Sequence, residues 1–285
     1  VAPGSQIISA RSQAHSTTPH GCLEDFFNDF KTMDGTSMAT PNVAGAAALI
    51  RQYFRSGKWI DKVIINGATT RAILINSCRH PRDSKIPDII FGHGVVDLST
   101  VIPINDDFGV QITHQETEGD KKNSVKEKGH VISYLSINKT KLVKKLQITL
   151  SYLDPILSSD SLIPLAHDLD LVVISPSKKV YLGDHLNNND TQHASTNEKV
   201  IINDDEIEDG QYAIHVFAGS FADGVPWRDP IEQDFSVVAS GPIDNGYLEF
   251  EESKECLCDK CDPDHPNICL CDVDKNIGPL CQVKI

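Results

Sequence analysis

The serine in the segment Asp34-Gly35-Thr36-Ser37-Met38-Ala39-Thr40-Pro41 has the surroundings of a nucleophile. Gly35 carries no Cβ, so the chain can turn sharply just before the serine, and Thr36 and Ser37 are typical of a helix start. The first turn of a helix has unpaired N–H groups and the positive end of the dipole, which together favour negative charge. An oxyanion forms when serine attacks a carbonyl carbon. The segment therefore predicts acyl transfer at Ser37, with its own backbone N–H as an oxyanion donor.

The elements that must position this serine are expected to be helical, although a Gly-Thr-Ser tripeptide alone also fits an ordinary capped helix. The small residues 44–48 predict a helix packed on all sides, since Gly45 would cost about 1 kcal/mol in an exposed helix. Pro41 is expected in the first turn, where proline is tolerated. This helix is expected to end near residues 55–57, and a second helix is predicted over residues 68–78.

Residues 34–49 closely resemble the serine motif of the subtilisin-like serine proteases, the subtilases. Val1-Ala2-Pro3-Gly4 and Phe91-Gly92-His93-Gly94-Val95-Val96-Asp97 resemble two further landmarks of that family, in the right order. The resemblance implies a serine endopeptidase that acts on polypeptide substrates through an acyl-enzyme on Ser37. It implies no cofactor for the chemistry itself.

In the family, the catalytic aspartate, the catalytic histidine and an oxyanion asparagine precede the serine and would lie upstream of Val1. The chain is therefore expected to be a C-terminal fragment with an incomplete triad, inactive alone. None of its histidines is expected to be the base: His15 and His20 are predicted to be loop residues, and His93 a turn residue. A non-catalytic binding or adhesion protein on a degenerate protease scaffold is the alternative. The intact motif around Ser37 favours the enzyme.

The chain is expected to contain three parts. Residues 1–105 are predicted to be the α/β C-terminal part of a subtilisin-like catalytic domain. Residues 106–250 show apolar residues alternating with polar ones, which predicts an antiparallel β-sandwich, as at Leu146, Ile148, Leu150 and Tyr152. Residues 251–285 are predicted to be a small disulfide-rich module.

The predicted sandwich resembles the jelly-roll, or P-domain-like, domain that follows the catalytic domain in some subtilases. The segments that carry this resemblance are 167–173, 210–212 and 233–238.

Six of the eight cysteines lie in the last thirty residues, at Cys256, Cys258, Cys261, Cys269, Cys271 and Cys281. So dense a cluster with little apolar material needs disulfides, which indicates an oxidising compartment. The segment resembles an EGF-like module, and a zinc knuckle is the alternative. The protein is therefore expected to be secreted, at the cell surface, or lumenal or vacuolar, with the tail binding a cell-surface or protein partner. Cys22 could pair with Cys78.

Asp168 and Asp170 are two residues apart on a predicted strand, so their carboxylates share a face and repel each other. Calcium suits such oxygen ligands, and relatives with this domain often bind it. A structural calcium site at Asp168 and Asp170 is therefore one reading. A solvent-facing acidic edge is the other.

The net charge of −14 is concentrated in residues 101–253, which hold 12 basic and 26 acidic residues. Phosphate contacts need lysine and arginine, so nucleic acid is not expected as a partner. No apolar run approaches the ~20 residues that a membrane span requires, so none is expected in this chain.

Overall fold

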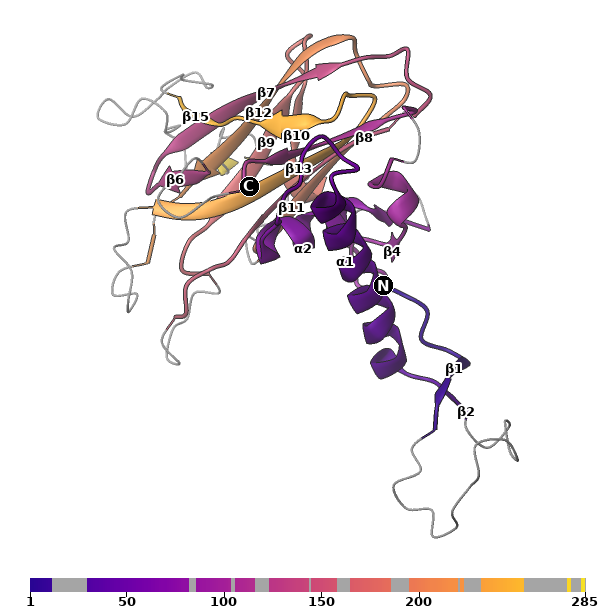
Figure 1. The fold of residues 1–285 in the computed structure, drawn as a ribbon. Helices are drawn as coiled ribbons and strands as arrows, with labels where there is room; N and C mark the ends of the chain where they lie inside the picture. The colour runs from indigo at the N-terminus through magenta and orange to yellow at the C-terminus, as the bar shows by residue number, and fades with distance from the viewer. Residues whose placement is uncertain are drawn as a thin grey trace, which may run out of the picture.

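The computed structural model describes residues 1–11, 30–81, 86–103, 106–115, 123–143, 145–157, 165–185, 195–219, 221–222, 232–253, 276–277 and 283–284. Two helices and several short strands come first, and longer strands follow (Figure 1). In chain order the elements are β1 (Ile7–Ala10), β2 (Phe30–Met33), α1 (Thr36–Ser56), α2 (Gly67–Asn76), β3 (Cys78–Arg79), β4 (Val95–Val96), η2 (Leu98–Thr100), β5 (Gly109–Thr113), β6 (Ser124–Lys126), β7 (His130–Ile137), β8 (Lys145–Tyr152), β9 (Leu169–Ile174), β10 (Val180–Leu182), η3 (Gly183–His185), β11 (Asn197–Asn203), β12 (Gly210–Ala218), β13 (Glu232–Gly241), β14 (Gly246–Leu248), β15 (Glu251–Glu252), β16 (Asn276–Ile277) and β17 (Val283–Lys284).

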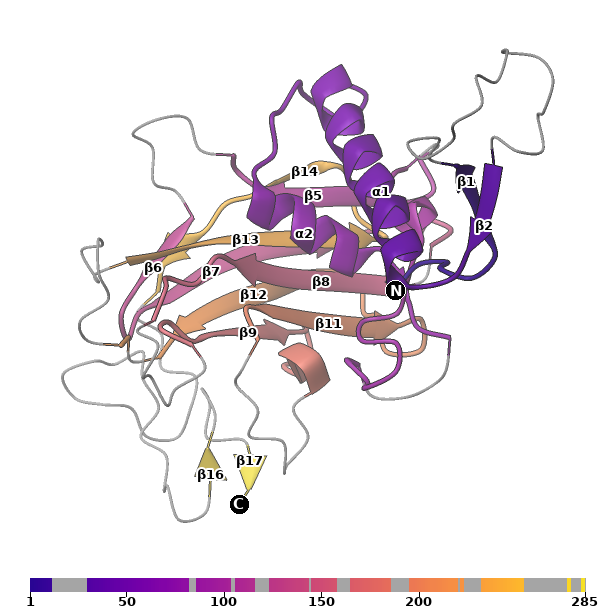
Figure 2. The ribbon, with the colours of Figure 1, turned by 90° about the horizontal axis from the view of Figure 1, so that it is seen from below.

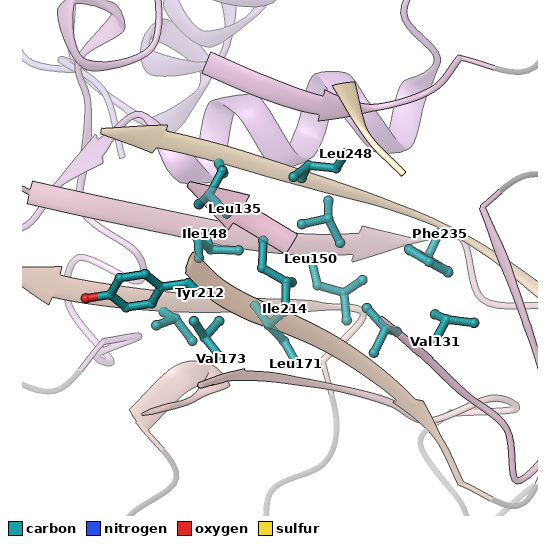
Figure 3. Packing of buried hydrophobic residues seen from close by; sticks show 14 of the residues in the cluster. Val131, Leu135, Ile148, Leu150, Leu171, Val173, Tyr212, Ile214, Phe235 and Leu248 are labelled. Atoms are coloured by element: carbon teal, nitrogen blue, oxygen red, sulfur yellow. The ribbon is translucent and has the colours of Figure 1, made fainter. Parts of the chain in front are cut away.

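Two sheets form a β-sandwich. One sheet has the order β10-β9-β12-β7-β15, and the other has the order β11-β8-β13-β5-β14, with β6 added to β13. Neighbouring strands are antiparallel except β14 and β5, which are parallel. Apolar side chains from the facing surfaces interdigitate between the sheets, among them Ile148, Leu150, Leu171 and Ile214 (Figure 3). This interior is where the predicted alternation places its apolar residues.

The helices cover the outer face of the six-stranded sheet (Figure 2). A second apolar cluster forms there between the last turns of α1, the helix α2 and the sheet, and it includes Phe54, Ile73 and Val110. Trp59 fixes the contact by donating its indole N–H to the carbonyl of Val110, at 2.9 Å. The first hundred residues and the sandwich therefore share a core.

Strand β8 is buried on both of its faces. In an alternating strand the polar face usually lies in water, but Gln147, Thr149 and Ser151 are buried as well. The reason is that α2 lies over the polar side of the strand and contacts both β8 and β13. A polar residue in a strand can thus face a helix instead of solvent.

The N-terminal half of α1 also differs from the expectation. Only Ile50, Tyr53 and Phe54 of this helix are buried, whereas Ala44, Gly45, Ala48 and Leu49 are exposed. Figure 1 shows the reason: the helix projects away from the sandwich, and β1 and β2 lie at its far end. In the described part of the chain, the helix is therefore not packed on all sides.

The α/β class expected for residues 1–105 is not confirmed. Within the described residues of this part, the strands form only two antiparallel pairs, β1 with β2 and β3 with β4. The second helix appears almost where predicted, with Ala72 and Ile73 fully buried. None of the helices in the described ranges is both long enough and apolar enough to cross a membrane.

The cysteine-rich segment lies almost wholly outside the described residues, and so does Cys22. The expected module and its disulfides therefore stay predictions. Cys78 is a free, buried thiol, 3.2 Å from the carbonyl oxygen of Leu74.

Candidate active site

Ser37 is the second residue of α1, and it is exposed. Gly35 is the N-cap, and no side chain caps the helix, so neither Thr36 nor Ser37 uses its hydroxyl for capping. Within the described residues no partner occupies the hydroxyl or the backbone N–H of Ser37. An exposed hydroxyl beside a free first-turn N–H is the arrangement that nucleophilic attack requires.

The turn before the serine is held by the first residues of the chain. Gly35 has φ of 143°, in the region that favours glycine, and its N–H donates to the carbonyl of Gly4 at 2.7 Å. A Cβ on Gly4 would lie 2.7 Å from the carbonyl oxygen of Gly35, so the two backbones can approach this closely only because Gly4 has no side chain. Asn42 adds a second contact by donating its amide to the carbonyl of Pro3, at 2.9 Å.

The same segment is fixed at both of its ends. Val1 donates its amino group to the carbonyl of Gly94 at 2.6 Å, and Val96 donates its N–H to the carbonyl of Val1 at 3.1 Å. At the other end, the carboxylate of Asp34 accepts from the Ser5 hydroxyl and the Gln6 N–H, each at 2.6 Å. Both hydrogen bonds stabilise the charged carboxylate, so they lower the pKa of Asp34, and the bond from Ser5 contributes most.

The three landmarks that suggested the family are therefore adjacent in space. The 1–4 and 91–97 segments meet at Val1, and the 1–4 segment meets the serine turn at Gly4. The order of the motifs indicated the family, but the sequence analysis did not predict this adjacency and did not single out Asn42 as a support.

Pro41 was expected in the first turn of the helix, but it lies further along. It is the sixth residue of α1, inside the helix. Proline has no N–H to donate to the carbonyl four residues earlier, so the carbonyl of Ser37 loses its normal helical partner. This leaves both backbone polar groups of Ser37 without the usual intrahelical bond to the residue four positions away.

The described histidines do not supply a base to Ser37. His93 lies between Gly92 and Gly94, which both have positive φ, as a turn residue would. Burial, with Lys199 and the amino terminus nearby, lowers the pKa of His93 to about 4. His15 and His20 lie outside the described residues.

A buried lysine joins the sandwich to the subtilase-like segment, and sequence reasoning missed it. Lys199 on β11 extends to the C-terminal end of α2, where its ammonium donates to the carbonyls of Ile75, Asn76 and Cys78 at 2.9, 3.1 and 3.1 Å. The last carbonyls of a helix lack partners and carry partial negative charge, so this lysine satisfies them. Burial, helped by Lys145, lowers the pKa of Lys199 to about 7.

Further polar pairs follow along the same contact, which we call the α2 seam. Asn76 donates its amide to the Ser240 hydroxyl at 2.7 Å and accepts from the Thr149 hydroxyl at 2.9 Å. At the other end of α2, the hydroxyls of Thr69 and Ser236 are 2.9 Å apart. The seam is defined by Thr69, Arg71 and Asn76 on the helix and by Thr149, Ser151, Lys199, Ser236 and Ser240 on the sheet.

The proposed calcium ligands lie near other carboxylates. Glu198 on β11 is buried, and burial followed by the charges of Asp170, Asp184 and Asp168 raises its pKa. Burial also raises the pKa of Asp184 to about 7. Within the described ranges, no three His, Cys, Asp or Glu side chains form a group that could hold a metal ion.

Comparison with known proteins agrees with this geometry. Residues 1–94 match the model of the subtilase family. The chain is 27% identical to the Serine protease/ABC transporter B family protein tagA of Dictyostelium discoideum, over 98% of this chain and 16% of that protein. It is also 35% identical to tagB of the same organism, over 28% of this chain and 5% of tagB.

A plant relative matches in the same way. The Subtilisin-like protease SBT2.2 of Arabidopsis thaliana is 40% identical over 27% of this chain and 8% of that protein. The chain thus spans a small part of the curated relatives that it matches. The match of residues 1–94 to the subtilase family, together with these relatives, supports a subtilisin-like serine protease scaffold in that part of the chain.

Proposed function

We propose that the protein is a subtilisin-like serine endopeptidase in which Ser37 forms the acyl-enzyme. The observation that carries this proposal is the exposed, unpaired Ser37 at the start of α1, in a turn held by Gly4 and Gly35. Its Oγ would attack the carbonyl carbon of a peptide bond and transfer its proton to a general base. The carbonyl oxygen would become an oxyanion that accepts a hydrogen bond from the N–H of Ser37, and its collapse would break the C–N bond, release the amine with the proton returned by the base, and leave the acyl group on Oγ.

The proton acceptor has to come from outside the described residues, because none of them hydrogen-bonds the Ser37 hydroxyl. Without a base, serine is a weak nucleophile. The 285-residue chain alone is therefore expected to be inactive. In a longer protein, the exposed face of α1 would be covered by the part that supplies the base and its orienting aspartate.

The experiment is labelling of the full-length protein with a fluorophosphonate probe. Ser37→Ala should abolish labelling and peptide hydrolysis, with kcat falling by several orders of magnitude. Ser136→Ala removes another exposed hydroxyl, on β7, and should change neither. Equal labelling of the native protein and Ser37→Ala would exclude Ser37 as the nucleophile.

We further propose a structural calcium ion beside Asp168 and Asp170, with additional ligands from the polar segment that follows η3. What supports it is the mutual repulsion of the nearby carboxylates, which a cation would relieve. Calcium should then raise the melting temperature, and Asp170→Asn should remove that increase. If protons alone neutralise the cluster, Asp170→Asn raises stability without calcium.

The cysteine-rich tail supports an oxidising compartment outside the cytoplasm and a partner at a surface, and both belong to the proposal. Mass spectrometry without reduction should find the six tail cysteines linked in three disulfides. Free thiols at those positions would contradict it.

A further inference from the structure

The strand pair β1–β2 presents one face beside the nucleophile. Its register pairs Ile7 with Met33 and Ser9 with Lys31. Side chains that alternate along a strand share a face, so these four lie on the same side of the pair. Figure 1 places the pair at the start of α1, far from the sandwich.

This face lines a cavity of about 390 Å³. Met38, which directly follows Ser37, closes one side, so the cavity begins one residue from the nucleophile. Its volume falls within the range of ~300–1,000 Å³ that is usual for ligand pockets. The lining residues are Ile7, Ser9, Ala10, Arg11, Lys31, Met33 and Met38.

The lining of the cavity combines apolar and cationic side chains. Ile7, Met33 and Met38 give it apolar, adaptable walls, and Arg11 and Lys31 give it two cations. No acidic side chain is among the described residues that line it. The acid nearest in sequence to the serine, Asp34, directs its carboxylate to Ser5 and Gln6.

We propose that this cavity is a substrate subsite that selects an acidic side chain, with glutamate preferred. The methylenes of glutamate would contact Met33 and Met38, and its carboxylate would meet Arg11 and Lys31, arginine being suited to bind both oxygens. This inference rests on the endopeptidase function proposed above and names the class of substrate for the same site.

The experiment uses the full-length protein and a set of fluorogenic peptides with Glu, Gln or Lys at each of three positions on either side of the scissile bond. At one position, kcat/KM for Glu should exceed that for Gln by about two- to five-fold, the size expected for exposed ion pairs. Raising the salt from 0.05 to 0.5 M should reduce the ratio, because exposed charges are screened.

The double variant Arg11→Glu/Lys31→Glu should invert the preference from Glu to Lys. Lys58→Glu is the matched control for a single charge reversal, since Lys58 follows the other end of α1, about 30 Å from the strand pair. It should keep the preference for Glu.

Fluorophosphonate labelling separates the outcomes. A double variant that still labels at Ser37 is folded and competent, so its peptide preference reports on the cavity. The inference is overturned if a labelling enzyme cleaves the Glu and Gln peptides equally at every position, or if the double variant keeps the Glu preference. A full-length protein that does not label at all overturns the endopeptidase function, and this inference with it.

Discussion

The two helices of the subtilase segment lie in opposite surroundings. The first half of α1 is largely exposed, the hydroxyl of Ser37 has no partner among the described residues, and a Cβ at Gly45 would meet nothing within 4 Å. The helix α2 is buried against the sandwich, and Lys199 satisfies its last carbonyls. The comparison shows that this chain combines an anchored half with an open half, and that Ser37, the proposed nucleophile, belongs to the open half.

The contact that anchors α2 to the sandwich contains polar pairs as well as apolar side chains. A buried polar group without a partner costs about 1–3 kcal/mol, so the seam is favourable only when every pair is complete. The seam therefore ties helix and sheet in one register, whereas among the described residues the first half of α1 makes no hydrogen bond to the sandwich and its Asn42 hydrogen-bonds only Pro3 outside the helix. The variants below test this difference from the largest expected effect to the smallest.

Lys199→Ala should have the largest effect. It removes the side chain that donates to the carbonyls of Ile75, Asn76 and Cys78, and we expect the free energy of unfolding to fall by about 3 kcal/mol. Chemical denaturation followed by tryptophan fluorescence measures this, because Trp59 lies in the shared core. Lys58→Ala, an exposed lysine, should change the value by less than about 0.5 kcal/mol. Equal effects of the two variants would show that the sandwich does not anchor α2 through Lys199.

The same lysine should make stability depend on pH. The pKa of Lys199 falls from its ordinary 10.5 to about 7 in the folded chain. Between these values the unfolded chain holds a proton that the folded chain has lost, so stability rises with pH from about 7 towards 10.5 and is lost as pH falls towards 7. Lys199→Met removes this term, so the native chain should gain roughly 3 kcal/mol over the variant between pH 7 and 9.5. Parallel pH profiles for the two chains would contradict it.

Asn76→Ala tests whether the seam works as a set of pairs. It leaves the hydroxyls of Ser240 and Thr149 buried without their partner and should cost about 2 kcal/mol. Adding Ser240→Ala and Thr149→Val should recover part of that loss, because the orphaned hydroxyls are then gone. Losses that simply add up would show that the three residues do not act together.

Gly45→Ala should have the smallest effect and the opposite sign. A Cβ at Gly45 meets nothing within 4 Å, and alanine is favoured over glycine in an exposed helix by about 1 kcal/mol. The 285-residue chain should therefore gain about that much stability. If α1 is covered in the full-length protein, the gain should disappear there, so thermal denaturation of both forms shows whether the open half becomes buried.

Much of the local structure could be predicted from the sequence. The helix after Ser37, its end near Gly57, the second helix and the strands of the sandwich follow from hydrophobic periodicity and from glycine positions. The serine motif indicated the family, and residues 1–94 match its model. These signals lie in neighbouring residues, so they can be recognised without knowledge of the fold.

The errors arose where a residue's partner is distant in sequence. Pro41 was placed in the first turn because a serine or threonine N-cap was assumed, whereas the close approach of Gly4 makes Gly35 the cap. Lys199 alternates with Val200 along a strand and so appears to be a solvent-facing residue, yet α2 covers it. Periodicity tells which side chains share a face, but it does not tell what covers that face.

The sequence by itself predicted Ser37 as the nucleophile and indicated the family and the order of the helices and longer strands, because these signals lie in adjacent residues. Only the tertiary structure decided which helix is anchored and which is open, because that depends on pairings such as Lys199 with Ile75, more than a hundred residues apart. It also decided that Arg11 and Lys31 share a cavity beside Ser37. Burial and charge at a site are properties of the neighbours that folding brings together, and no local pattern specifies them.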